Sequence, residues 1–308
     1  MSIITARYWG RTGNVLFEIA AAITYANRFN RPFAFTSFPG FPNLDKYSPS
    51  LFGFADDDEF AKSLQDYAEE DFVKNVPFPA DVNVRLTGFY QDHKLFEPVK
   101  AQVFDVLGIP QIREDALSKI GPKFNQFGLF GDNAITVSLH IRKGDYQDLK
   151  CYFLNLDEYY YKGALLKMAE KLGPAQIKVL CFYEKKSAEP SKQLVEALKD
   201  DPDLANYDLE YYHFSELMDD QVSDVEELAI MSHCNHHILA NSTYSWWGAY
   251  MNPDPEKIVC YPDEHYNHQL HYLSSAGLNL PEWISVKAWS PKKYKCECWQ
   301  RCGYRVAE

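Results

Sequence analysis

A group of polar side chains that could bind an anion follows a run of apolar residues near the middle of the chain. The segment VSLHIRKGD ends in His140, Arg142, Lys143 and Asp145. The apolar run predicts a buried strand, and α/β sheets bind their ligands at the carboxyl ends of strands. An arginine can hold a phosphate through two hydrogen bonds, and a lysine adds a point charge. We therefore expect a phosphate site at this strand end.

A second stretch with matching chemistry lies about one hundred residues further on. The segment NSTYSWWG follows the predicted strand HHILA and opens a helix. Hydroxyl groups together with backbone N–H groups at a helix start form a site for anions. The residues that this interpretation selects are Asn241, Ser242, Thr243, Tyr244 and Ser245. The alternative is a plain helix cap, for which serine and threonine are also preferred.

A third loop, GRTGN, follows the first predicted strand and contributes Gly13 and Asn14. It has neither the G-x-G-x-x-G pattern nor the lysine of a Walker loop. Each of the three stretches also has an ordinary explanation. Arg142 could be a salt-bridge partner and His140 a core histidine. The occurrence of all three stretches in one chain favours a diphosphate site.

The order of predicted elements indicates an α/β protein with parallel sheets. In the first half we expect strands at residues 2–9, 31–38 and 81–91, a helix at 15–30, and loops with short helices at 40–75. In the second half we expect strands at 134–142, 177–184, 209–214, 236–240 and 257–262, the last being the final strand, with helices at 156–172, 191–198, 223–234 and 241–251. Strands that alternate with helices predict Rossmann-like sheets. We place an N-terminal lobe at 1–132, a Rossmann-like lobe at 133–285 and an irregular extension at 286–308.

Composition narrows the classes of partner. The net charge of -12 argues against a nucleic-acid-binding protein, which needs a basic face. No window reaches the roughly 20 apolar residues of a membrane span, so we expect no stable membrane insertion. Scattered cysteines indicate free thiols in the cytoplasm, although the tail KCECWQRC could form half of a zinc site. A glycan on the sequon at Asn241 would block the predicted phosphate loop, which also favours a cytoplasmic protein. The acidic run at 56–59 is typical of a solvated loop rather than a metal site.

Four motifs resemble those of a known family. WGRTGNVLFEIAAA, GFYQDHKLF, HIRKGDY and ILANSTYSWWGAYMNP occur in the order and approximate spacing of the α-1,2-fucosyltransferases, glycosyltransferase family 11. The resemblance covers about residues 7–265. It implies a GT-B-like fold with two Rossmann-like lobes around a donor cleft, the N-terminal lobe being the acceptor side. The implied activity is that of a galactoside 2-α-L-fucosyltransferase. Such an enzyme moves L-fucose from GDP-β-L-fucose with inversion to the 2-hydroxyl of a galactose in a glycan, with no metal or other cofactor.

The resemblance also implies roles for residues of the second lobe. Arg142 would hold the β-phosphate and stabilise it as it leaves, and His140 would contact the nucleotide or orient this arginine. Lys143 and the 241–245 loop would bind the diphosphate together with Gly13 and Asn14. Glu184 stands where relatives have an acidic residue near guanine. The alternative for Glu184 is an ordinary surface residue after a strand.

The motifs indicate the catalytic base and the residues that contact the acceptor less clearly. An inverting displacement needs a base for the acceptor hydroxyl. Asp145 is the obvious carboxylate, although it could instead brace Arg142 or cap the next segment. From the first lobe, Glu18, Gln91 and Asp92 could touch the acceptor, as could Asn14.

Departures from the family pattern leave other functions open. Arg11 and Thr12 replace a glycine and a leucine of the usual first loop, and Lys143 replaces a common second arginine. The alternatives are a transferase for another GDP-sugar, of rhamnose or mannose type, and a non-catalytic glycan- or nucleotide-binding protein.

Overall fold

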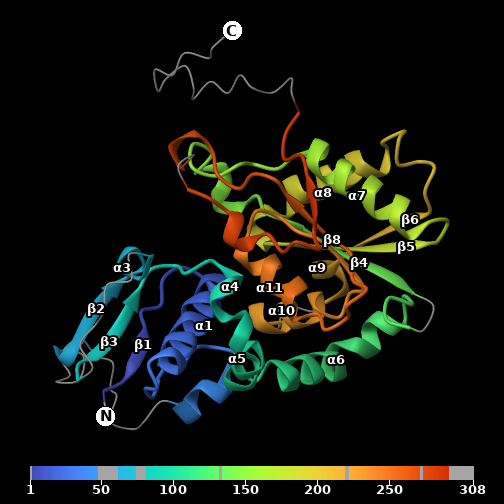
Figure 1. The fold of residues 1–308 in the computed structure, drawn as a ribbon. Coiled ribbons are helices and arrows are strands. Elements are labelled where there is room, and N and C mark those ends of the chain that lie inside the picture. Colours follow the sequence, from blue (N-terminus) through green and yellow to red (C-terminus); the bar gives the residue numbers. More distant parts are fainter. Residues whose placement is uncertain are drawn as a thin grey trace. The chain divides into compact units, whose positions relative to one another are not determined.

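Two compact units make up the chain in the computed structural model (Figure 1). The structure describes residues 2–47, 62–73, 81–131, 134–218, 222–270 and 273–290. The first unit comprises residues 1–116, 223–229 and 276–278, and the second comprises 117–222, 230–275 and 279–308. The expected lobe boundary at residue 132 thus falls inside the second unit. The acidic run at 56–59 and most of the expected extension, with the cysteines of KCECWQRC, lie outside the described residues.

The first unit is built on a parallel sheet with the strand order β1-β3-β2. Its strands are β1 (Ile4–Ala6), β2 (Leu64–Ala68) and β3 (Asn83–Thr87). Helix α1 (Thr12–Arg28) packs against β1, and its predicted apolar face is buried at Leu16, Ile19 and Ile23. Around it lie α4 (His93–Phe96) and α5 (Lys100–Leu107). The short elements are η1 (Pro42–Tyr47), α3 (Glu69–Val73) and η2 (Glu97–Val99), and α6 (Ile109–Asn125) follows α5.

Two predictions for this unit were wrong. The expected strand at 31–38 is reduced to a single bridge between Phe33 and Ile4. Its aromatic residues serve ring packing instead, with Phe33 against Phe35 and Tyr47. The segment expected to hold only loops and short helices contains β2. This edge strand buries only Tyr67 and therefore lacks an alternating apolar pattern.

The second unit has a six-stranded parallel sheet in the order β6-β5-β4-β7-β8-β9. The strands are β4 (Ile135–Ile141), β5 (Ile177–Tyr183), β6 (Leu209–His213), β7 (His236–Ile238), β8 (Val259–Pro262) and β9 (Ile284–Val286). This is the Rossmann order, and it reverses between β4 and β7. Two parallel-sheet α/β units confirm the predicted GT-B-like fold class. The strand at 257–262 is not the final one, because β9 follows it. Three residues are too few to show a period of two.

Helices cover both faces of this sheet (Figure 1). Val137, Leu139 and Ile141 pack into a core with α7 (Glu158–Leu172) and α8 (Ala188–Lys199). Ser138 and His140 alternate with them and face the opposite side. That side carries α9 (Phe214–Leu217) and α11 (Thr243–Met251). Helix α10 (Asp224–Met231) and the turns η3 (Gly144–Gln147), η4 (Lys185–Ser187), η5 (His268–Leu270) and η6 (Ala276–Leu278) complete the described elements.

A buried chain of hydrogen bonds joins β4, β7 and the end of α11. The amide of Asn252 lies 3.0 Å from Nε2 of His237, whose Nδ1 lies 2.8 Å from the hydroxyl of Ser138. The same amide donates to the carbonyl of Cys234 at 2.9 Å. Because the amide nitrogen donates to Nε2, the ring proton sits on Nδ1 and is donated to Ser138. This chain anchors the C-terminal end of α11 to the sheet.

We predict that Asn252→Ala destabilises the protein by about 2 to 3 kcal/mol, because buried hydrogen-bonding groups on His237 and Cys234 lose their donor. Urea unfolding at neutral pH measures this loss. Asn206→Ala, at an exposed position, is the matched control and should change the free energy of unfolding by less than about 0.5 kcal/mol. Equal effects of the two substitutions would contradict the anchoring role.

Candidate active site where the strand order reverses

The carboxyl ends of β4 and β7 separate at the point where the strand order reverses. The paired part of β4 ends at Leu139 on the β7 side. Beyond it, the hydroxyl of Tyr160 donates to the carbonyl of Leu239, and that of Tyr161 donates to the carbonyl of His140 at 3.0 Å. Two adjacent tyrosines of α7 thus satisfy backbone groups that the sheet no longer pairs. The segments after β4 and β7 are thereby held apart, as at the ligand-binding edge of a Rossmann sheet.

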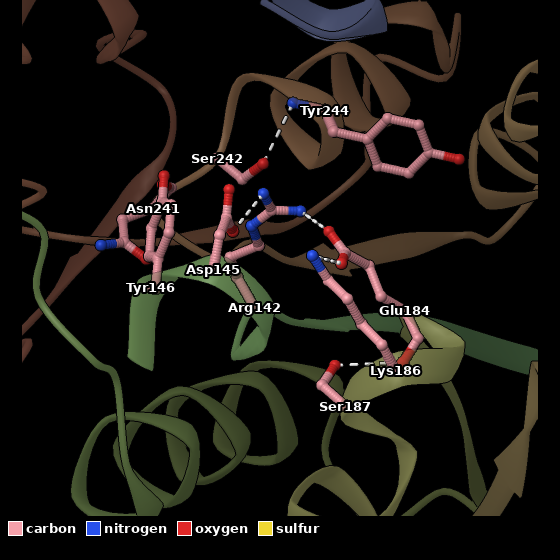
Figure 2. A network of polar contacts seen from close by, with 9 residues as sticks. All are labelled: Arg142, Asp145, Tyr146, Glu184, Lys186, Ser187, Asn241, Ser242 and Tyr244. Carbon is pink, nitrogen blue, oxygen red and sulfur yellow. Dashed lines mark hydrogen bonds and ion pairs between the residues drawn. The ribbon is translucent and has the colours of Figure 1, made fainter. Parts of the chain in front are cut away.

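Arg142 is the centre of a polar network just after β4 (Figure 2). One terminal nitrogen donates to the carboxylate of Glu184, and the other lies 2.7 Å from Oδ1 of Asp145. The guanidinium carbon lies 5.1 Å from the centre of the Tyr146 ring. The arginine side chain is only 11% exposed. The structure therefore brings together three residues predicted from separate arguments, and it shows Asp145 bracing Arg142.

Glu184 has a second cationic partner. Its Oε2 lies 3.1 Å from Nζ of Lys186, which follows it in the turn after β5. A Cβ atom at Gly144 would lie 2.8 Å from the same Oε2, so a glycine here leaves room for the carboxylate. Lys186 was missed in the sequence because a lysine after a strand end carries no signal of its own.

Tyr146 is a second residue that the sequence reasoning missed. Its hydroxyl donates to the carbonyl of Asn241 at 3.0 Å, and its ring stacks on Phe153 at 4.5 Å between centres. Tyr146 therefore ties the turn after β4 to the loop before α11. Its position directly after HIRKGD was the available signal.

The predicted 241–245 loop begins α11 as expected. Ser242 is the N-cap, and its hydroxyl accepts a hydrogen bond from the amide of Tyr244. Thr243 is the first helical residue. Ser245 is fully buried, accepting from the amide of Ala240 and donating to the carbonyl of Ser242. Its hydroxyl therefore shapes the loop from within.

Asn241 supports this loop from the β7 side. Its buried amide nitrogen donates to the carbonyls of Leu154 and His265 at 2.8 and 3.0 Å. Its side-chain oxygen has no partner within the described ranges. Lys143 likewise turns to the backbone, where its ammonium donates to the carbonyl of Leu156. Contact of Asn241 and Lys143 with a phosphate stays a prediction.

His140 is buried beside this network. Its ring centre lies 5.7 Å from that of Tyr244, and its Nδ1 atom has no partner in the described part of the chain. Burial, and then the positive charge of Arg142, lowers the pKa of His140 from 6.5 to about 3, against an opposing effect of Glu184. The imidazole is therefore neutral over the physiological range. A neutral imidazole can form a hydrogen bond with a ligand but supplies no positive charge.

Comparison with known proteins assigns the family. A family model for glycosyl transferase family 11 matches residues 59–287. The chain belongs to glycosyl transferase family 11. The family resemblance carried by the four sequence motifs is thereby confirmed.

Two family 11 relatives and one solved structure illustrate the likeness. The O-antigen biosynthesis glycosyltransferase WbnK of Escherichia coli is 26% identical over 223 residues, which are 70% of this chain and 65% of that protein. An alpha-1,2-colitosyltransferase of Escherichia coli is 26% identical over 198 residues, 60% of this chain and 57% of that protein. The chain thus spans less than two thirds of the length of these relatives. A structure of a mutant of Arabidopsis thaliana FUT1 in complex with GDP is 13% identical, with 84% of this chain and 70% of that one covered and a TM-score of 0.46.

The site residues predicted in the first unit make separate polar contacts. Gly13 and Asn14 lie in the first turn of α1 rather than in a loop before it. The side-chain oxygen of Asn14 accepts a hydrogen bond from Gln91 at 3.1 Å. Asp92 is the N-cap of α4 and accepts from the amide of Lys94 at 3.0 Å. Asp92 therefore has a structural function in the helix start.

Glu18 also supports the backbone. The residue is 1% exposed, and its carboxyl group accepts a hydrogen bond from the amide of Trp9 at 2.9 Å. Burial raises its pKa to about 8. Glu69 accepts the amide of Phe89 at 2.9 Å in the same way. The aromatic side chains of Trp9 and Phe89 are 39% and 43% exposed, and sequence reasoning missed both.

Within the described residues, no helix is long and apolar enough to cross a membrane. No group of three or more His, Cys, Asp or Glu side chains in these ranges is arranged to hold a metal ion.

We predict that His140 makes the protein less stable in acid. Its pKa is about 3 when folded and about 6.5 when unfolded, so below pH 6.5 protons bind preferentially to the unfolded chain. Between pH 7.5 and 4.5 this should remove about 2 to 3 kcal/mol of stability. His140→Phe should lack this loss, as measured by urea unfolding at both pH values.

His265 offers a parallel site, because burial lowers its pKa to about 4. His265→Phe should therefore also reduce the loss of stability in acid. A pH dependence of His140→Phe equal to that of the wild type would contradict a neutral, buried His140.

Proposed function

We propose that this family 11 enzyme transfers L-fucose from GDP-β-L-fucose, with inversion, to a hydroxyl of a glycan, the 2-hydroxyl of a galactose being the expected acceptor. The observation that carries the proposal is the position of Arg142. It stands at the reversal of the Rossmann strand order, in the network that also reaches the loop opening α11 through Tyr146. A fixed cation at the edge where such sheets bind nucleotides suits a diphosphate.

The donor would be bound and activated by fixed charges and dipoles. Arg142 would donate to the β-phosphate, and the N-terminal end of α11, with the partial positive charge of the helix dipole, would face the diphosphate. As the bond to the sugar breaks, negative charge grows on the leaving GDP. A preorganised guanidinium and a helix N-terminus stabilise that charge without moving. We propose that the reaction proceeds without a metal, because these groups can supply the positive charge.

Glu184 and Asp145 would divide the remaining donor and base functions. Guanine presents N–H groups at N1 and N2, and a carboxylate such as Glu184 can accept a hydrogen bond from each of them. Adenine does not offer this pair of donors. Asp145 is the candidate base, because its side chain is 37% exposed at the end of the same turn. In this position its carboxylate would accept the proton of the acceptor hydroxyl.

The first unit offers a surface for the sugar of the acceptor. Trp9 and Phe89 follow the neighbouring strands β1 and β3, and their ring centres lie 6.2 Å apart. The guanidinium of Arg7 lies over the Trp9 ring at 5.2 Å. Galactose has one face of C–H groups, which packs well on an aromatic ring. We propose that these two rings, held by Glu18 and Glu69 through their backbones, contact the acceptor in place of Glu18 and Asp92.

A second candidate function differs only in the transferred sugar. One matched relative is named as a colitosyltransferase, so a GDP-sugar other than GDP-fucose is the main alternative. We propose the cytoplasm as the compartment. Free thiols at Cys151, Cys181, Cys234 and Cys260 are in keeping with a reducing environment.

The nucleotide preference tests the donor class. GDP and GDP-fucose at about 100 times their dissociation constants should stabilise the wild type by about 2.7 kcal/mol in thermal-shift experiments, equally with EDTA. Arg142→Lys should lower kcat/KM with GDP-fucose by about 100- to 1,000-fold, because a lysine cannot make the paired hydrogen bonds. Arg85 lies on β3 and pairs with Asp66 on β2. Arg85→Lys is the control and should leave kcat/KM unchanged. A shift with UDP alone, or only with added metal, would overturn the proposal.

The acceptor surface is tested by truncating its rings. Trp9→Ala and Phe89→Ala should each raise the KM for a galactose-terminated acceptor about fivefold, because aromatic contacts of this kind contribute about 1 kcal/mol. GDP affinity should not change. Phe29→Ala removes a similarly exposed ring from the same unit, one that also lies beside an arginine, and should leave the acceptor KM unchanged. Equal KM values in all variants would exclude the two rings as the acceptor surface.

A further inference from the structure

Arg142 is already paired with two carboxylate side chains of the protein before any ligand is bound. Each of its terminal nitrogens donates to a carboxylate, one from Glu184 and one from Asp145. The three side chains together have one positive and two negative charges. A phosphate that contacts Arg142 would therefore approach two carboxylates of its own sign, and like charges at contact distance repel strongly in a poorly hydrated site.

Glu184 is the carboxylate that can leave. Its backbone is fixed, because its carbonyl accepts from the amide and the hydroxyl of Ser187 at 2.9 and 3.0 Å. Its side chain, however, reaches Arg142 from another strand and has Lys186 as a second cation at 3.1 Å. If it leaves Arg142, the carboxylate keeps this partner. Lys186 is 54% exposed and can follow it.

Asp145 is less able to leave. It lies three residues from Arg142 in the short turn η3, which begins at Gly144 and is closed by the hydrogen bond from the amide of Gln147 to the carbonyl of Lys143 at 3.1 Å. The neighbouring Tyr146 ring lies against the same guanidinium. Asp145 and Tyr146 thus form one local support for Arg142, whereas Glu184 comes from 42 residues away in the sequence.

We propose that Glu184 is a resident anion on Arg142, which the donor diphosphate displaces, and that the released carboxylate then accepts the N–H groups of guanine. This inference rests on the proposed function. The phosphate takes the hydrogen bond that Glu184 gives up, and Lys186 retains the carboxylate. Binding of the base and binding of the phosphate are coupled through one side chain. Arg142 is shielded from other anions until a ligand offers both groups.

The proposed exchange affects the binding of a ligand without a base differently from that of a ligand with guanine. Inorganic pyrophosphate must displace Glu184 and offers it nothing in return. Its apparent affinity is therefore reduced by the fraction of molecules in which Arg142 is accessible. GDP displaces the same carboxylate but supplies it with two donors. The site thus discriminates against free pyrophosphate and phosphate as well as against adenine nucleotides.

Glu184→Gln tests the exchange, because it keeps the shape of the side chain and removes its charge. Isothermal titration of the full chain with pyrophosphate, GDP and ADP at constant ionic strength is the measurement. We expect pyrophosphate to bind the variant about tenfold more tightly than the wild type, since the competing anion is gone. The preference for GDP over ADP should fall in the same variant.

Two further variants control the result. Glu189→Gln makes the same chemical change five residues away, at an exposed side chain that pairs with Gln193, and should leave all three affinities unchanged. Lys186→Met removes the cation that receives the released carboxylate. It should weaken pyrophosphate binding, opposite in sign to Glu184→Gln.

The possible outcomes separate this inference from the proposed function. Unchanged or weaker pyrophosphate binding by Glu184→Gln, with GDP binding to the wild type intact, would overturn the exchange and make Glu184 a permanent brace. Failure of the wild type to bind GDP would overturn the proposed function. Tighter pyrophosphate binding in that case would still support displacement of Glu184 by an anion and would overturn the coupling to guanine.

Discussion

The charge of Arg142 has to be compensated within the protein, since its side chain is only 11% exposed. An unpaired charge withdrawn from water is strongly unfavourable, so carboxylates come to it from the end of β5 and from η3. In a chain with a net charge of -12, these carboxylates keep one cation in place at the anion site that we propose. The cation is kept in place by the protein's own anions, and in the proposed function a phosphate would have to compete with them.

The rigidity of that site comes from neutral hydrogen bonds behind it. Tyr160 and Tyr161 satisfy the carbonyls at the ends of the two diverging strands, and Tyr146 links the turn after β4 to Asn241. Buried backbone groups need partners, and each of these bonds also fixes a segment that borders Arg142. The proposed exchange would therefore require only side chains to move, those of Glu184 and Lys186.

In the first unit, acidic side chains also accept hydrogen bonds that fix nearby segments, here the backbone beside two aromatic residues. A buried carboxylate of Glu18 and the carboxylate of Glu69 hold the backbone amides of Trp9 and Phe89. Acidic side chains that attract attention in the sequence thus serve the backbone, and the rings that they support face solvent. Burial decides between binding a ligand and supporting the backbone, because the side chain of Glu18, a residue that is 1% exposed, has little access to a ligand.

The sequence by itself determined the α/β class and most strands and helices of the second unit, and it selected Arg142 and the loop that opens α11 as candidate site residues. Apolar periodicity and helix-start residues are local, so they can be recognised without the fold. Strand β9 and edge strand β2 escaped because one is too short and the other too polar to show a period. The partners of Arg142 and the function of Tyr146 also required the structure. Only the tertiary structure decided the reversed strand order and brought Glu184 to Arg142, because parallel strands take their neighbours from distant segments that no local pattern specifies.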